Sequence, residues 1–179
     1  MTPSKPNLGW YSRGYLPHCD EAGLVQHIVF SLADSVPPGF RSPSAIHADR
    51  LLDAGHGACA LRESACAEFV ENALLHSDGE LYRLIAWCVM PNHVHTIVEQ
   101  IEGYPLGDIV QSWKSATSHK INAHLGREGR LWRREYFDRF MPDDDHLSTT
   151  IAYVEANPVR AKLAAAASDR RFSSARRRA

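Results

Sequence analysis

The 179-residue chain lacks most features that mark membrane-spanning, secreted or ATP-driven proteins. Its four cysteines show none of the short paired spacings of a zinc site, so we expect reduced, buried thiols. No apolar run approaches the roughly 18 residues that cross a bilayer, and no signal-peptide core precedes Trp10. A glycine-rich loop that could cradle nucleotide phosphates is also missing. These absences favour a cytoplasmic protein whose chemistry does not draw on a bound nucleotide.

A net charge of only −1 gives no sign of a nucleic-acid partner, but the charge is unevenly distributed. Residues 1–109 contain 6 Lys+Arg and 13 Asp+Glu, whereas residues 110–179 contain 14 and 8. This asymmetry, −7 against +6, can place a basic face on a near-neutral molecule. The last ten residues hold five arginines and are typical of a mobile basic tail, either solvated or in contact with phosphates.

The hydrophobic pattern predicts one domain over residues 1–179, with an irregular segment at 1–20 and a basic tail at 164–179. The predicted elements are a strand at 24–33, a helical region at 44–75 broken at 55–57, strands at 81–90 and 93–99, a helix at 105–125, a strand at 131–141, and a helix from 142 that ends at Asn157 before Pro158. This β-α-β-β-α-β order predicts an α+β, ferredoxin-like sandwich with an additional C-terminal helix, which carries Tyr153.

Two histidines, His93 and His95, lie at the start of the second strand of a predicted hairpin. Because side chains alternate along a strand, both histidines point to one face and Val94 points to the other. Two neutral imidazoles at this spacing can chelate one metal ion. Two histidines on a solvated strand face remain the alternative, because short motifs often occur by accident.

The last predicted helix places Tyr153 and Asn157 four residues apart, so a phenol and an amide carbonyl face the same space. Leu147, Ile151 and Val154 recur at helical spacing and are expected to face the core. Taken alone, the pair is better explained by a boundary tyrosine followed by a helix-ending asparagine.

Together these patterns resemble the single-tyrosine HUH transposases, and within them the REP-associated tyrosine transposases of bacteria. The matching segments are WCVMPNHVHTIVE at 87–99, SWKSATSHKIN at 112–122, LWRREYFDRFM at 131–141 and IAYVEANPVRAKL at 151–163. The four blocks follow the order and spacing of the family, and the resemblance covers about residues 10–175.

The resemblance implies that His93 and His95 are metal ligands, that Asn157 supplies a third ligand through its side-chain oxygen, and that Tyr153 is the nucleophile. It implies a metal-dependent endonuclease and strand transferase that forms a 5′-phosphotyrosine on single-stranded hairpin DNA, such as a REP-like palindrome. A divalent ion on the scissile phosphate would assist a phenol whose ordinary pKa is near 10. The family implies Mg²⁺, whereas the ligand types alone favour Mn²⁺.

Tyr136 is a rival nucleophile, although packing or base stacking explains it better within its aromatic block. The candidate phosphate contacts are Lys114, Lys120, Arg133, Arg134 and Arg139. His124 shows no ligand spacing with a partner residue, so we expect a surface or structural role.

Two other functions remain open at this stage. A non-cleaving protein could recognise hairpin DNA and regulate it, although binding alone requires neither the histidines nor Tyr153. A metal phosphodiesterase could instead use water, with Tyr153 structural. For each of these functions we expect a bacterial, nucleoid-associated protein in the cytoplasm. It would act on DNA as a monomer or homodimer, without a membrane partner.

Overall fold

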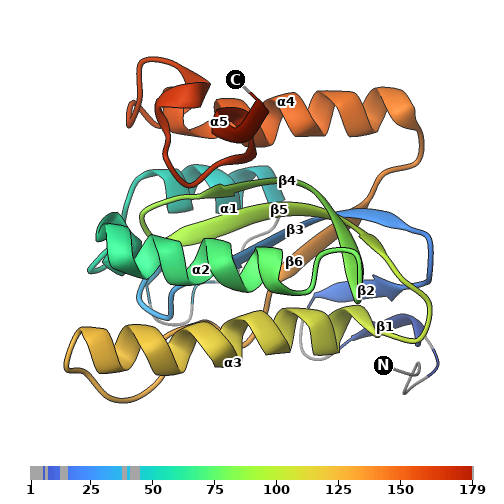
Figure 1. Cartoon of the computed structure of the whole chain (residues 1–179), viewed down its shortest axis with the longest axis horizontal. Coiled ribbons are helices and arrows are strands. Elements are labelled where there is room, and N and C mark those ends of the chain that lie inside the picture. Colours follow the sequence, from blue (N-terminus) through green and yellow to red (C-terminus); the bar gives the residue numbers. More distant parts are fainter. Residues whose placement is uncertain (1–5, 7, 13–15, 38–39, 41–44, 179) are drawn as a thin grey trace.

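The computed structural model describes residues 6, 8–12, 16–37, 40 and 45–178, with 45–48 as backbone only. The predicted start of the first helix, at residue 44, lies outside these ranges. Within them, the main architecture is a four-stranded antiparallel sheet between helices (Figure 1).

The sheet has the strand order β4-β5-β3-β6. Its strands are β3 (Val25–Ser31), β4 (Tyr82–Val89), β5 (His93–Gln100) and β6 (Phe137–Phe140). All three neighbouring pairs are antiparallel. The first predicted strand lies in the centre, beside the second strand of the hairpin. This order is the one expected of a β-α-β-β-α-β sandwich, so the predicted α+β fold is confirmed.

Helices cover both faces of the sheet, as Figure 1 shows. The helices α2 (Ser64–His76) and α3 (Leu106–His124) lie on one face, where they enclose the largest apolar cluster. The helix α4 (Asp144–Arg160) lies on the other face, over a smaller cluster that includes Ile97 and Val154. The helix α1 (Ala45–Asp53) precedes α2, and a short helix, η1 (Ala60–Arg62), joins the two. Because side chains alternate along a strand, the two faces of the sheet contribute to two separate apolar clusters.

Two predicted boundaries in the second half of the chain were wrong. The strand predicted at 131–141 is regular only over Phe137–Phe140, and Trp132 makes a single bridge to Leu32. The last helix does not stop at Asn157 but continues to Arg160 with Pro158 inside it. Pro158 falls in the final turn, where it removes one backbone donor, and Ala161 still donates to the Asn157 carbonyl. A proline so close to the end of a helix therefore costs little.

Both termini have more structure than the sequence indicated. The segment expected to be irregular contains a hairpin of β1 (Gly9–Ser12) and β2 (Pro17–Asp20). The segment expected to be a basic tail contains η2 (Ala167–Asp169) and α5 (Ser174–Arg178). Neither short element has a periodicity that a sequence pattern could reveal.

The C-terminal segment is attached to the outer edge of β4. Ser173 makes an antiparallel bridge to Cys88, and the Phe172 carbonyl accepts from the Val89 amide. The Arg170 guanidinium donates twice to the Val89 carbonyl, while Arg178 forms an ion pair with Glu155. The predicted mobile tail is therefore wrong for the described residues up to 178. No helix in the described part of the chain is long and apolar enough to cross a membrane.

Candidate active site and nucleic-acid interface

The two predicted metal-binding histidines converge on one point. His93 and His95 are fully buried at the start of β5, on the face that α4 covers. Their Nε2 atoms lie 3.0 Å apart. Burial lowers the pKa of His95 to about 3 and holds that of His93 well below its usual value, so both rings are neutral at physiological pH.

Hydrogen bonds to the other ring nitrogens set how these imidazoles are oriented. Asn92 Oδ1 accepts from His93 Nδ1 over 2.8 Å, so the proton sits on Nδ1 and Nε2 of His93 carries a lone pair. His95 Nδ1 contacts Nε2 of His27 on β3 at 3.0 Å. Such outer partners hold metal-binding imidazoles in one tautomer and one orientation. Asn92, which had no clear role in the sequence, is the partner that orients His93.

Oxygen donors border the same point. Asn157 of α4 is fully buried, and its amide Nδ2 lies 2.9 Å from His95 Nε2. Asn157 Oδ1 and Asp53 Oδ1 are buried without a hydrogen-bond partner among the described residues. Asp53 Oδ1 lies 3.6 Å from His93 Nε2. Rotating the Asn157 amide end for end brings its oxygen to the imidazoles. Two imidazole lone pairs beside unsatisfied buried oxygens form a donor set compatible with a divalent metal ion.

Tyr153 lies beside these histidines within the same chain. Its ring centroid is 6.1 Å from that of His95 and 6.3 Å from that of His27, edge-on in both cases. Its hydroxyl donates a 2.7 Å hydrogen bond to Asp49 Oδ2 on α1. The Arg160 guanidinium lies 4.4 Å from the centroid of the tyrosine ring. The structure thus brings together the tyrosine, both histidines and Asn157, the four residues that the sequence singled out for catalysis and metal binding.

The electrostatics of the tyrosine favour a neutral phenol. Burial, and then the Asp49 carboxylate, raise the pKa of Tyr153 to about 12. Burial likewise raises the pKa of Asp49, and raises that of Asp53 to about 6, where nearby Asp49 adds to the effect. A nucleophilic role would therefore need a group that accepts the phenol proton, and Asp49 is already hydrogen-bonded to it.

The rival tyrosine belongs to a different cluster. Tyr136 is only 5% exposed and packs with the apolar cluster under α2 and α3. Its ring stacks on His18 at 4.4 Å, and its hydroxyl pairs with that of Tyr11 at 3.0 Å. This buried position on the other side of the sheet favours packing over catalysis for Tyr136.

Sequence reasoning missed His27, Asp49 and Asp53. His27 lies within the central strand β3, next to Gln26, and this pair of polar residues in a mostly apolar strand was a signal that the pattern contained. Asp49 and Asp53 are four residues apart on α1, the spacing that places two carboxylates on one helix face. No local pattern shows that this helix packs near the start of β5.

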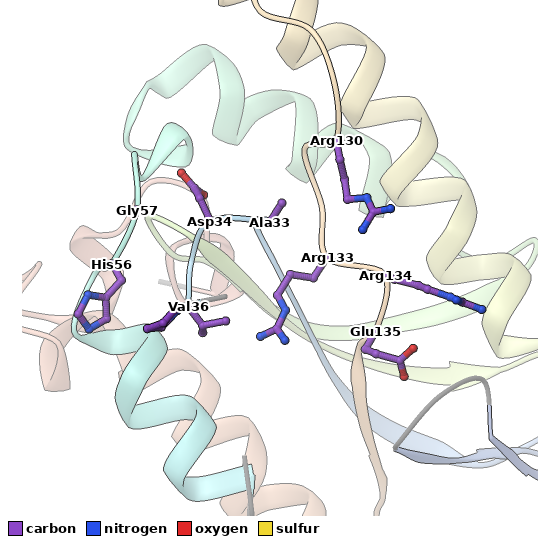
Figure 2. Close-up of a pocket in the computed structure, with 10 residues that line it drawn as sticks. Ala33, Asp34, Val36, His56, Gly57, Arg130, Arg133, Arg134 and Glu135 are labelled. Atoms are coloured by element: carbon purple, nitrogen blue, oxygen red, sulfur yellow. The ribbon is translucent and has the colours of Figure 1, made fainter. Parts of the chain in front are cut away.

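Arginines line a cleft that is linked by one hydrogen bond to the residue before His93. The cleft has a volume of about 780 Å³ and is lined by residues 33, 34, 36 and 37, by His56 and Gly57, and by residues 130 and 133–135. Figure 2 shows Arg133 reaching across the cleft toward Val36, whereas Arg134 points away toward α3. His56 belongs to the wall of the cleft, and its carbonyl accepts a hydrogen bond from the Asn92 side-chain amide. Asn92 immediately precedes His93 in the sequence.

The five predicted phosphate contacts are not equivalent. Arg133 and Arg134 line the cleft and its neighbour of about 520 Å³. Arg139 is exposed and lies opposite His27 across β3 and β6, hence on the face of the histidines. Lys120 is exposed on α3 and lines neither cleft.

The Lys114 ammonium is engaged by backbone carbonyls, so the residue supports the structure and does not present its charge to solvent. It is only 6% exposed, and Nζ donates to the carbonyls of Arg133, Arg134 and Glu135 at 3.0 to 3.3 Å. It therefore holds the segment that carries two of the arginines against α3.

Comparison with known protein families shows which family the chain belongs to. The family model described as IS200-like transposase matches residues 62–157, which is more than half of the chain. The chain belongs to the IS200-like transposase family. The matched segment contains the two histidines, Tyr153 and Asn157, and membership supports a transposase-like role in binding and processing DNA.

One solved structure shares the fold at low sequence identity, and a second gives a weaker match. A structure of a REP-associated tyrosine transposase bound to a REP hairpin has a TM-score of 0.57 and 17% identity, covering 95% of this chain and 84% of that one. A candidate transposase from Deinococcus radiodurans has a TM-score of 0.42 and 17% identity, covering 82% of this chain and 96% of that one. Among curated proteins, no sequence matches the chain significantly.

Proposed function

We propose that this chain is a metal-dependent single-stranded DNA endonuclease and strand transferase, with Tyr153 as the nucleophile. The observation that carries the proposal is the position of the Tyr153 ring, 6.1 Å from the ring of His95, beside the two converging Nε2 atoms. A divalent ion, Mg²⁺ or Mn²⁺, held by His93, His95 and Asn157, would neutralise charge on the scissile phosphate. Asp53 is a further candidate ligand, because its buried Oδ1 has no partner among the described residues.

The chain's own groups supply the proton chemistry. As the Tyr153 oxygen forms its bond to phosphorus, the bond from phosphorus to the 3′-oxygen breaks, leaving a 5′-phosphotyrosine and a 3′-hydroxyl. The phenol proton passes to Asp49 Oδ2, its hydrogen-bond partner at 2.7 Å, and the departing 3′-oxygen takes a proton from water. Rejoining reverses these steps, with Asp49 returning the proton. The phosphotyrosine retains the energy of the broken bond, so no nucleotide is needed.

The positions of the basic residues support a path for the DNA strand. Arg139 flanks the histidines on the same face of the sheet, and Arg133 reaches into the arginine-lined cleft. A single strand that enters the site would continue into this cleft, with its phosphates facing the arginines. We therefore propose a folded substrate, a hairpin with a single-stranded flank. The REP hairpin named for the structural relative supports this choice.

The proposed setting follows from the substrate. We propose a bacterial protein that works on the chromosome in the cytoplasm. α4 packs against β4 and β5 of its own chain, which supports attack by Tyr153 on DNA bound to the same chain. Exchange of this helix between two copies would make the enzyme a homodimer.

The decisive experiment is covalent trapping. The full chain is incubated with end-labelled hairpin DNA and Mn²⁺ or Mg²⁺, and the products are separated on a denaturing gel. We expect a metal-dependent protein–DNA adduct that Tyr153→Phe and His95→Ala abolish and that Tyr136→Phe, the matched control, retains.

Each other outcome contradicts a defined part of the proposal. Cleavage that survives Tyr153→Phe without an adduct would assign the reaction to water. An adduct that is abolished by Tyr136→Phe and not by Tyr153→Phe would make Tyr136 the nucleophile. Hairpin binding without cleavage under any metal would leave a regulatory DNA-binding protein.

A further inference from the structure

A second group of potential metal ligands lies away from the tyrosine site, where α2 begins and α3 ends. It consists of Glu63, Cys66 and His124, whose ligand atoms all lie within 4.8 Å of one another. Glu63 immediately precedes α2, Cys66 lies in its first turn, and His124 is the last residue of α3. Residues three apart at a helix start share one face, so the carboxylate and the thiol both meet the histidine.

The three side chains differ in burial in a way that suits a bound ion. Cys66 is fully buried and is a free thiol, whereas Glu63 and His124 are partly exposed above it. His124 Nε2 lies 2.5 Å from Glu63 Oε1. The imidazole also packs edge-on against Phe69 of α2, with centroids 6.0 Å apart. The thiol thus lies buried beneath the carboxylate and the imidazole, which are exposed and hydrogen-bonded to each other.

We propose that Glu63, Cys66 and His124 bind one Zn²⁺ ion that joins α2 to α3, separately from the ion at the tyrosine site. Thiolate, imidazole and carboxylate are the three protein ligands that zinc prefers, at about 2.0 to 2.3 Å each. Ligand atoms around a tetrahedral ion lie roughly 3.3 to 3.8 Å apart, so the Glu63 and His124 atoms, now 2.5 Å apart, would separate by about 1 Å to admit the ion. The C-terminal end of α3 and the N-terminal end of α2 both meet here, so their dipoles offset and the ligand charges govern the attraction for a cation.

The chemistry of the set separates it from the catalytic group. The anionic carboxylate and thiolate balance the two positive charges of the ion, and the thiol proton is released to solvent. A thiolate ligand selects zinc or cobalt over Mg²⁺ and Mn²⁺, whereas the histidines and oxygens of the tyrosine site include no thiolate. The fourth position stays open to water. The two helices cover the same face of the sheet, so the ion would stabilise that layer without taking part in DNA cleavage.

Cobalt substitution tests the site by a signal that only a thiolate produces. The metal-free full chain carrying His93→Ala and His95→Ala, which silence the tyrosine site, is titrated with Co²⁺. We expect a near-ultraviolet thiolate-to-cobalt charge-transfer band that saturates at one ion per chain and is lost on adding Zn²⁺. Cys66→Ser and His124→Ala should remove the band, and Glu63→Gln should weaken binding roughly tenfold or more.

Matched controls keep the test independent of folding and of the proposed catalysis. Cys59→Ser, which alters another buried free thiol, should retain the band. His124→Ala changes a partly exposed residue and keeps the fold if Cys66→Ser does not. Zn²⁺ should raise the melting temperature of the His93→Ala, His95→Ala chain by several degrees, and Mg²⁺ should not. Absence of the band at saturating Co²⁺, or its survival in both Cys66→Ser and His124→Ala, would overturn the proposal. Neither result bears on covalent trapping through Tyr153.

Discussion

The Tyr153 hydroxyl of α4 donates a 2.7 Å hydrogen bond to the Asp49 carboxylate of α1. Helices that are far apart in the sequence thus meet at the oxygen that we propose as the nucleophile. The bond holds the phenol beside the histidines and gives its proton a destination. It also raises the pKa of the phenol, after burial, so that the proton leaves only during attack.

Replacing Asp49 with Asn should slow covalent adduct formation by about 100-fold, because the amide accepts a hydrogen bond but not a proton. In the wild type, burial raises the pKa of Asp49, and the rate should fall as pH decreases through that pKa, since the protonated acid cannot act as a base. The variant should lose this pH dependence. Single-turnover rates across pH measure both effects. Wild-type rates in Asp49→Asn would show that the proton goes elsewhere.

Replacing Asn92 with Ala should weaken Mn²⁺ binding by roughly 10- to 100-fold, because His93 loses the acceptor that sets its tautomer. Calorimetric titration of the metal-free chain provides the measurement. His146→Ala is the control, since this exposed histidine pairs with Asp143 at the start of α4 and lies outside the cluster. Equal affinities for Asn92→Ala and wild type would contradict the orienting role.

The metal-free protein should lose stability as pH falls, partly through His27. Burial, and then His95, lower the pKa of His27 to about 3, whereas the unfolded chain protonates this histidine near pH 6.5. The unfolded state therefore binds the extra proton between these values, and acid favours it. His27→Gln should therefore reduce the slope of the unfolding free energy against pH by about 1.4 kcal/mol per pH unit between about pH 6 and pH 4. Denaturant melts with parallel pH slopes would exclude this contribution.

Lys114 and Arg134, both candidate phosphate contacts, should separate into a structural and a DNA-binding role. Lys114→Met should cost about 2 kcal/mol of unfolding free energy, because three backbone carbonyls lose a buried charged donor. Arg134→Ala should leave stability unchanged and reduce the salt dependence of hairpin binding by about one ion. Thermal melts and binding titrations at several salt concentrations distinguish the two. A stable Lys114→Met with weakened DNA binding would reverse the assignment.

Much of the fold could be predicted because it depends on local periodicity. Alternation placed Val94 in the cluster under α2 and α3, and His95 on the face of α4. Helical spacing placed Tyr153 and Asn157 on one side of α4. The errors came where packing overrides local preference. Pro158 is tolerated because it falls in the last turn, and the arginine-rich C-terminus is held because β4 has a free edge that Ser173 bridges.

The sequence by itself determined which residue types the site contains and which of them share a strand or helix face, because side-chain direction follows from local backbone geometry. Only the tertiary structure decided which other elements reach that point. His27 arrives from the neighbouring strand, and Asp49 and Asp53 arrive on α1, through packing contacts that no local pattern encodes. The same holds for Lys114. The sequence suggested a contact to DNA phosphates, whereas in the structure the side chain is buried and donates to three backbone carbonyls.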